Sequence, residues 1–130
     1  MANYADGLSI RVELTEFASD EIRKLGMLAD QAIVAATPFK DGQAKANWLM
    51  SINEPETRIN ENTSTFNASG SYSIDLARTV TESYPSDSLP VLWIVNNLPY
   101  IGRLNDGWSQ QQSTPKFVET AIAQAVSYGR

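Results

Sequence analysis

The sequence contains neither cysteine nor histidine among its 130 residues. The lack of cysteine excludes disulfides, thiol nucleophiles and thiolate metal sites. The lack of histidine removes the usual general base at neutral pH and the commonest ligand of transition metals. Most familiar catalytic and metal-binding arrangements are therefore excluded, and we predict that the chain uses no metal and no cofactor.

Positive charge is also scarce, and long apolar runs are absent. Ten basic residues against fifteen acidic ones give a net charge of −5, whereas nucleic-acid surfaces need clustered lysine or arginine. No run approaches the ~18 apolar residues of a membrane span, and the opening "MANYADGLS" lacks the pattern of a secretory signal. We expect no sequence-specific nucleic-acid partner, no membrane partner and a start in the cytoplasm.

The remaining composition is that of an ordinary folded protein. Hydrophobic residues make up 42% of the chain and charged residues 19%, which is typical of globular domains. A chain of this length builds one hydrophobic core. We predict a single domain over residues 1–130.

The first half of the chain alternates between strand and helix patterns. Residues 8–14 alternate apolar and polar side chains, which predicts a strand, and residues 16–36 place apolar side chains at helical spacing. Pro38 and Gly42 end that helix. A second strand is predicted over about 46–53, with room for one helical turn before it.

The second half adds a helix, a strand and a closing helix. A short helix is predicted from residue 71 to Pro85, with Ser71 or Ser73 as its N-cap. The apolar run 91–95, "VLWIV", predicts a central strand covered on both faces. The last helix is expected to begin at Thr114, with Pro115 in its first turn. The predicted fold class is α+β: a small mixed or antiparallel sheet of about three to four strands packed against a long N-terminal helix and a C-terminal helix.

Residues 54–70 predict an extended, exposed loop. Ile59 and Phe66 are the only large apolar side chains in this polar segment. A loop of this length is unusual in a compact domain unless it has a function. A contact surface is one interpretation, and an inert insertion or a ragged hairpin is the other.

Residues 96–117, "NNLPYIGRLNDGWSQQQSTPKF", contain a denser mixture of proline, glycine, aromatic and glutamine residues than a simple connecting loop needs. Asn96 and Asn97 tolerate left-handed angles and are expected to turn the chain, and Pro99 is expected to start a short helix through Asp106. Gly107 is expected to close this helix. Much of the segment is thereby explained as a capped helical turn.

Other side chains of the same segment favour a protein interface. Tyr100, Arg103 and Trp108 belong to the residue types enriched at the energetic centres of interfaces, and Trp108 is also expected to fold back near Leu104. The glutamines Gln110, Gln111 and Gln112 add a neutral polar surface. The interface residues that we predict in the whole chain are Asn97, Tyr100, Arg103, Trp108, Gln110, Ile59 and Phe66.

Two groups of charged residues allow a different interpretation. Asp30, Lys40 and Asp41 form one group, and the second consists of Glu54, Glu56 and Glu61. Paired carboxylates perform acid–base chemistry or hold a hard cation. Neither group has the spacing of a calcium loop, and acidic residues in polar loops are usually solvated.

Two blocks, "TPFKDGQAKANWLMSI" and "WIVNNLPYIGRLNDGWSQQQSTPKFVETAIAQA", resemble the neck or tail-completion proteins of lambdoid-type long-tailed bacteriophages, minor tail components of the virion. Thr37, Pro38, Gly42 and Trp48 match the family pattern in the first block, and Asn97, Pro99, Tyr100, Leu104 and Gly107 match it in the second. The family usually has other residues at Lys40, Asp41, Ile101 and Asn105. Contacts at those four positions are therefore not carried over.

The resemblance implies a structural protein without enzymatic activity. It implies a ring of identical subunits, a hexamer if it follows the symmetry of phage tails, or a subunit that joins a ring at the head–tail junction. The implied neighbours are connector, tail-terminator and tail-tube proteins, and the implied location is the virion after assembly in the host cytoplasm.

Three alternatives remain open at this point. A tail terminator or head-closure protein occupies the same junction with a similar small α+β build. A small carboxylate-dependent hydrolase, with Glu54, Glu56 or Asp106 as candidates, belongs to another class. A monomeric binding module for an unidentified ligand is the third.

Overall fold

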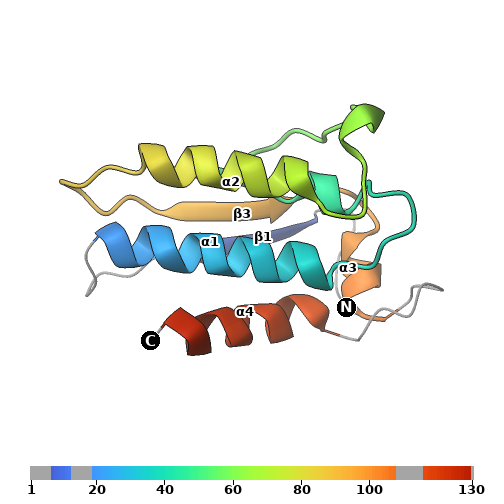
Figure 1. Ribbon diagram of the computed structural model, residues 1–130. Coiled ribbons are helices and arrows are strands. Elements are labelled where there is room, and N and C mark those ends of the chain that lie inside the picture. The colour runs from blue at the N-terminus through green and yellow to red at the C-terminus, as the bar shows by residue number, and fades with distance from the viewer. Residues whose placement is uncertain (1–6, 13–18, 108–115, 130) are drawn as a thin grey trace.

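The structure is a computed structural model that describes residues 7–12, 19–107 and 116–129 (Figure 1). Within these residues a three-stranded sheet is combined with four α-helices. The elements in chain order are β1 Leu8–Val12, α1 Ser19–Ala36, η2 Lys45–Asn47, β2 Leu49–Ile52, η3 Thr63–Thr65, α2 Ser71–Ser83, β3 Leu92–Asn96, α3 Ile101–Asn105 and α4 Phe117–Gly129, where η marks a 3-10 turn. The predicted α+β class is confirmed, and the sheet is antiparallel.

The sheet has the order β1-β3-β2, so β3 is central as predicted. Both outer strands pair antiparallel with β3, and Ile94 is opposite Ile10 on one side and Met50 on the other. These three side chains therefore share the face of the sheet that is covered by helices. The second strand is shorter than the predicted range 46–53, because residues 45–47 form the 3-10 turn η2. Of the predicted strand 8–14, residues 13 and 14 lie outside the described part.

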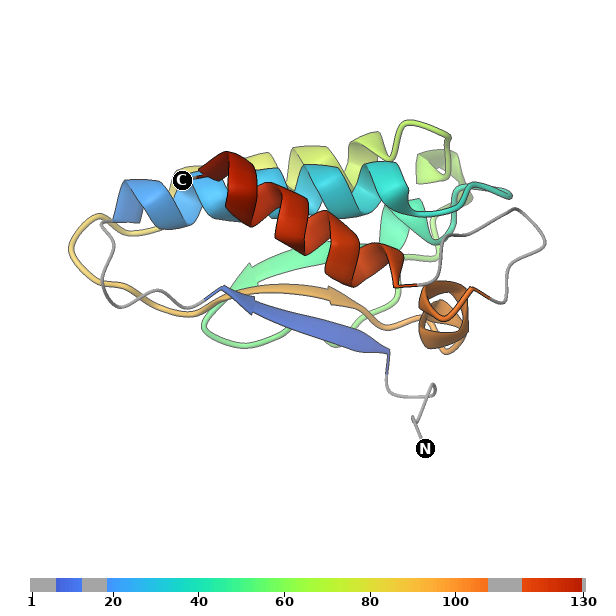
Figure 2. The same ribbon diagram turned by 90° about the horizontal axis from the view of Figure 1, so that it is seen from below.

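Helices α2, α1 and α4 lie side by side on one face of the sheet, with α1 in the middle (Figures 1 and 2). α1 approaches the sheet closely at Gly26, where an added Cβ would lie 2.4 Å from Cδ2 of Leu92. Ile22 and Ile33, on the same side of α1, are buried. No helix in the described residues is both long and apolar enough to cross a membrane.

The segment that follows β2 covers the opposite face of the sheet. Trp93 Nε1 donates to the carbonyl oxygen of Asn53 (2.9 Å), and Asn97 Nδ2 donates to the carbonyl oxygens of Glu56 and Arg58 (both 2.9 Å). Trp93 faces away from the helices because its neighbour Ile94 faces them, and Asn97 directly follows β3. The chain from residue 53 to 58 therefore runs back across this face of the sheet. Leu49 and Val95, on the same face, are fully buried. The prediction that β3 is covered on both faces is confirmed.

The cap expected at the start of α2 is wrong. Gly70, not a serine, is the N-cap, with a left-handed φ of 66°. Ser71 is the first helical residue, and the buried hydroxyl of Ser73 donates to the carbonyl oxygen of Lys45 (2.6 Å). A serine near a helix start predicts an N-cap. Here Gly70 adopts the cap position, and Ser73 instead forms a hydrogen bond that connects the helix to η2.

The turn out of β3 also differs from the expectation. The left-handed residues other than glycine in the described chain are Asn53 and Lys116, so Asn96 and Asn97 do not turn the chain by adopting positive φ. Instead the Asn96 side chain accepts a hydrogen bond from the N–H of Leu98 (3.2 Å). α3 begins two residues after Pro99, and Gly107 has the positive φ (89°) expected after a helix.

The last helix begins later than predicted. Lys116 has a φ of 62°, which interrupts helical geometry, and α4 starts at Phe117. Thr114 and Pro115, the predicted start, lie outside the described residues. The predicted apolar stripe is correct, because Phe117, Val118, Ala121 and Ala125 are buried.

Candidate functional site

Three segments that are distant in sequence meet at one end of the molecule, at the right of Figure 1. They are the turn 37–44 after α1, the residues 58–67 and the residues 97–107 around α3, and we call this region the α3 end. Tyr100 Oη donates to Oε1 of Gln43 (3.0 Å), and Asn96 Nδ2 donates to the carbonyl oxygen of Ala44 (3.1 Å). Segments 37–52 and 93–125 are therefore joined directly in space.

The first block ends α1 and anchors the chain that leaves it. Thr37 Oγ1 donates to the carbonyl oxygen of Ile33 (2.6 Å) and accepts a hydrogen bond from Nε1 of Trp48 (2.9 Å). Trp48 is completely buried. Lys45 Nζ donates to the carbonyl oxygen of Val34 (2.8 Å), and burial lowers the pKa of this amine. An ammonium at this position satisfies a terminal carbonyl and complements the helix dipole.

Gly42 allows the turn after α1 to pack closely against residues 66 and 67 of the 54–70 segment. Its φ is 88°, and an added Cβ would lie 2.4 Å from the backbone nitrogen of Asn67. Only glycine combines this angle with such a close backbone approach. Phe66, the residue before Asn67, is half-buried at this contact.

Side-chain amides fix the path of the 54–70 segment. Asn47 Oδ1 accepts from the backbone N–H of Asn60 (2.7 Å), and Asn47 Nδ2 donates to the carbonyl oxygens of Asn60 (3.0 Å) and Gln43 (2.9 Å). Asn60 in turn donates to the carbonyl oxygen of Ala46 and to Thr65 Oγ1. The segment predicted as an extended exposed loop thus keeps exposed residues but has a path set by buried hydrogen bonds.

Two of the predicted interface side chains take part in these internal contacts. Asn97 is half-buried and holds the 56–58 backbone, and Tyr100 is half-buried against Gln43. Burial, and secondarily the nearby Asp41 carboxylate, raises the pKa of Tyr100 to about 12. Both side chains therefore shape the α3 end, and a direct role in an interface remains a prediction.

The other predicted interface residues have varied positions. Ile59 is 40% exposed at the α3 end, and Arg103 is exposed on α3. Trp108 and Gln110 lie outside the described residues. The structure adds Phe39, 44% exposed in the turn after α1. The sequence signal for Phe39 was a large apolar residue placed directly after a helix-ending proline.

Asn105 connects α3 to α4. Its Oδ1 accepts from the N–H of Val118 (2.9 Å), and its Nδ2 donates to Oε1 of Glu119 (2.7 Å). Lys116 Nζ also donates to Oδ1 of Asp106 (3.0 Å). A side chain of another helix therefore caps the start of α4.

The predicted carboxylate groups do not form a shared site. Asp30 is completely buried on α1, whereas Lys40 and Asp41 are exposed, and Asp41 Oδ1 accepts from the N–H of Gln43 (2.9 Å). Neither carboxylate oxygen of Asp30 has a hydrogen-bond partner among the described residues, and burial raises its pKa well above the ordinary value.

The second acidic group is exposed along the polar segment. Glu54 and Glu61 are exposed, and Glu56 lies 3.6 Å from Nε of Arg58. Across residues 7–12, 19–107 and 116–129 there is no cluster of three or more acidic side chains arranged to hold a metal ion.

Comparison of the chain with protein-family models, with curated proteins and with solved structures gave no match.

Proposed function

We propose that the chain is a structural virion protein of a tailed bacteriophage, a neck or tail-completion subunit that forms or joins a ring at the head–tail junction. The observation that carries the proposal is the meeting of the two pattern-matching blocks at the α3 end. Their members are joined by hydrogen bonds from Tyr100 to Gln43 and from Asn96 to Ala44.

The residues that match the family pattern determine the shape of the α3 end through internal contacts. Thr37 and Trp48 bond to each other beneath the turn, Asn97 holds the chain that covers the sheet, and Gly107 ends α3. None of these contacts needs a reacting group. A region that is shaped by internal bonds and presents a few apolar side chains suits association with other subunits better than chemistry.

The α3 end offers surface of the required kind. Phe39 and Ile59 expose 44% and 40% of their area. Arg103, which lies on α3 shortly after Tyr100 in the sequence, is also exposed. In a ring each subunit uses two different surfaces, one for each neighbour, and rotation closes the assembly. The α3 end is one of these surfaces in our proposal. The partners are further copies of the chain, hexameric by the usual tail symmetry, and adjacent connector, tail-terminator or tail-tube proteins.

Negative-stain imaging of phage particles that lack the chain tests the proposal. We expect tails of normal length that fail to join heads, with joining restored by the wild-type chain supplied in trans. Tails of uncontrolled length would instead favour the tail-terminator alternative. Normal, infectious particles without the chain would refute a role at the junction.

A variant links this experiment to the α3 end. Arg103→Glu reverses an exposed charge on α3 and should restore joining poorly, whereas Arg78→Glu reverses an exposed charge on the distant α2 and should restore it fully. Equal rescue by both variants would remove the α3 end from the proposed contact.

A further inference from the structure

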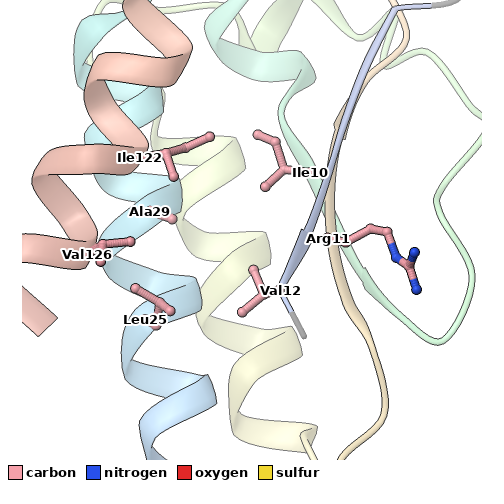
Figure 3. A pocket seen from close by; sticks show the side chains of 7 residues that line it. All are labelled: Ile10, Arg11, Val12, Leu25, Ala29, Ile122 and Val126. Atoms are coloured by element: carbon pink, nitrogen blue, oxygen red, sulfur yellow. The ribbon is translucent and has the colours of Figure 1, made fainter. Parts of the chain in front are cut away.

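A groove of about 200 Å³ lies between β1, α1 and α4 (Figure 3). The side chains on its walls are apolar, and Arg11, which borders it, points to the opposite side of β1 (Figure 3). The lining residues therefore offer no side chain that could react. Groups that can react with one another lie instead in the turn after α1, where Asp41 directly precedes Gly42.

An aspartate followed by glycine can react with its own backbone. The glycine nitrogen attacks Cγ of the aspartate, the new N–Cγ bond closes a succinimide ring, and the amide proton leaves with the hydroxyl of the protonated carboxyl group as water. Water then adds to either carbonyl of the ring. Addition at Cγ restores aspartate, whereas addition at the main-chain carbonyl gives isoaspartate, in which the chain continues through the side-chain carboxyl. Glycine favours the reaction because it has no Cβ to shield its nitrogen.

Two Asp–Gly pairs lie entirely within the described residues, and one of them is held by hydrogen bonds at both reacting groups. The N–H of Gly107 donates to the carbonyl oxygen of Leu104 (3.0 Å), and Oδ1 of Asp106 accepts from Nζ of Lys116 (3.0 Å). These bonds must open before the nitrogen can attack the carboxyl group. The sequence contains a third pair at residues 6 and 7, and residue 6 lies outside the described part.

At Asp41 and Gly42 the nitrogen is not engaged and the carboxyl group is held beside it. Asp41 is exposed, and the N–H of Gly42 donates to no acceptor among the described residues. Oδ1 of Asp41 accepts from the N–H of Gln43 (2.9 Å), which closes a ring that contains both Cγ of Asp41 and the nitrogen of Gly42. The side chain is thereby folded back toward the nitrogen that attacks it.

Isoaspartate at position 41 changes the geometry of the α3 end. It adds one atom to the main chain directly before Gly42, and this glycine is closely packed, since an added Cβ would lie 2.4 Å from the backbone nitrogen of Asn67. The next residue, Gln43, accepts the hydrogen bond from Tyr100. A longer main chain displaces the turn and with it the acceptor of this bond.

We propose that Asp41 is a site of spontaneous isomerisation to isoaspartate in the folded protein, and that the conversion detaches the turn 37–44 from Tyr100. The reaction needs no co-reactant, because the water that is lost in the first step is regained in the second. The contact between the turn and α3 therefore weakens as the protein ages. The inference does not depend on the proposed place of the chain in a virion.

Ageing of the full chain at neutral pH, followed by peptide mapping, tests the proposal. Asp-N protease cuts before aspartate but not before isoaspartate, and electron-transfer fragmentation locates the isomer, which has the same mass as the original chain. We expect isoaspartate to accumulate at Asp41 at least ~3-fold faster than at Asp106, because each bond that must open slows the second site. In urea both pairs lose these contacts, and the two rates should become similar.

Two variants at the same position serve as matched controls. Asp41→Asn can form the same succinimide with loss of ammonia, and it should convert faster than the wild type because a neutral amide is attacked more easily than a carboxylate. Asp41→Glu would need a larger ring, so position 41 should stay unmodified while conversion at Asp106 continues as in the wild type.

The effect on the α3 end is measured on the modified fraction after chromatographic separation. Its amide NMR signals should differ from those of the fresh protein at Gln43, Asn67 and Tyr100, whereas the signal of Arg78 on the distant α2 should not. A rate at Asp41 no higher than that at Asp106, or the same ratio of rates in urea and in buffer, would overturn the assignment of the site. Unchanged signals at Gln43 and Tyr100 would refute the release of the turn.

Discussion

Asp30 is the most unusual single residue of the core. It lies on α1 one turn before Val34, whose side chain occupies the space next to Gly70 at the start of α2. The carboxyl group is completely buried, and its oxygens have no hydrogen-bond partner in the described chain. Burial disfavours the charged form, which raises the pKa of Asp30 well above its ordinary value of 3.8.

The raised pKa makes stability depend on pH in one direction. The folded state holds the proton of Asp30 more tightly than the unfolded state does. The stabilisation is complete below pH 3.8 and is lost as pH rises through the folded pKa, by up to about 1.4 kcal/mol per pH unit. Asp30→Asn has the same shape and cannot ionise. We expect this variant to be more stable than the wild type at pH 7, by about 1 kcal/mol or more, with a difference that shrinks toward pH 4.

Urea unfolding of both proteins between pH 4 and pH 8 measures the effect. The control is Asp87→Asn, which makes the same substitution at an exposed position in the loop before β3. Parallel stability curves for the wild type and Asp30→Asn across this range would show that Asp30 does not titrate as inferred.

Asn47 supports a second prediction at the residue scale. Its amide makes three hydrogen bonds, two with the backbone of Asn60 and one with the backbone of Gln43. Asn47→Ala leaves the buried N–H of Asn60 without its partner, so we expect a loss of about 2–4 kcal/mol in the free energy of unfolding. Trypsin cleavage after Arg58 should become faster, because the 54–70 segment loses its anchor.

Asn62→Ala is the matched control on the same segment. Asn62 is exposed, and within the described residues its side chain bonds only in the local turn, to Ser64. We expect a loss below about 1 kcal/mol and unchanged cleavage at Arg58. Comparable losses for the two variants would mean that the Asn47 and Asn60 contacts do not hold the segment.

The asparagines also show what could not be predicted at this scale. Asparagine favours exposed turns, so the composition of residues 54–70 indicated a solvated loop. An amide can equally pair with a buried backbone, as Asn47 and Asn60 do. The choice depends on which distant part of the chain lies beneath the segment, here the turn η2, and no local pattern contains that information.

At the scale of elements, the distance between α1 and the sheet depends on Gly26. Alanine there improves helix propensity by about 1 kcal/mol, but its Cβ would lie 2.4 Å from Cδ2 of Leu92, a completely buried side chain of β3. We expect Gly26→Ala to destabilise the protein by about 1–3 kcal/mol, because overpacking outweighs propensity. Chemical unfolding measures this loss.

A double-mutant cycle identifies the cause. Leu92→Val shortens the side chain that Gly26→Ala would meet, so the cost of Gly26→Ala should be smaller in that background. Gln31→Ala, at an exposed position of the same helix, should change stability by less than about 0.5 kcal/mol. Equal costs of Gly26→Ala in both backgrounds would contradict contact with Leu92.

Helices and strands whose apolar residues recur at a regular spacing could be predicted from the sequence. The residues at which they begin and end were harder to predict. α1, β3 and the apolar stripe of α4 follow patterns in which core-facing positions repeat regularly, so their type and place are confirmed. The predicted cap of α2 and the predicted start of α4 were wrong, because Gly70 and Lys116 adopt left-handed angles. Propensity indicates that a cap is near but does not select the residue that provides it.

At the scale of the whole molecule, exposed apolar side chains gather at the two ends. Phe39 and Ile59 lie at the α3 end, whereas Leu89 belongs to the loop between α2 and β3 at the opposite end (Figure 1). The sequence singled out residues 96–117 as an unusual segment, and residues 97–107 of it lie at the α3 end. Which surface meets another subunit depends on the arrangement of distant segments, and the number of subunits is not encoded in any local pattern.

The final prediction uses this distribution to test self-association. Phe39 and Leu89 are each 44% exposed, so a glutamate at either position should cost the fold similarly little. If the α3 end contacts the next subunit, Phe39→Glu places a charge in that contact and should lower the assembled mass toward that of one 14.3 kDa chain. Light scattering after size-exclusion chromatography measures the mass, with and without co-expressed tail-tube protein.

Leu89→Glu separates a specific effect from a general one, because it adds the same charge at the other end of the molecule. An unchanged assembly in Leu89→Glu beside a disrupted one in Phe39→Glu would place the contact at the α3 end. Loss of assembly in both variants would show a general effect of the added charge and would not place the contact at the α3 end. Full assembly of Phe39→Glu would exclude the α3 end, because a buried and unpaired glutamate is too costly to accommodate in an interface.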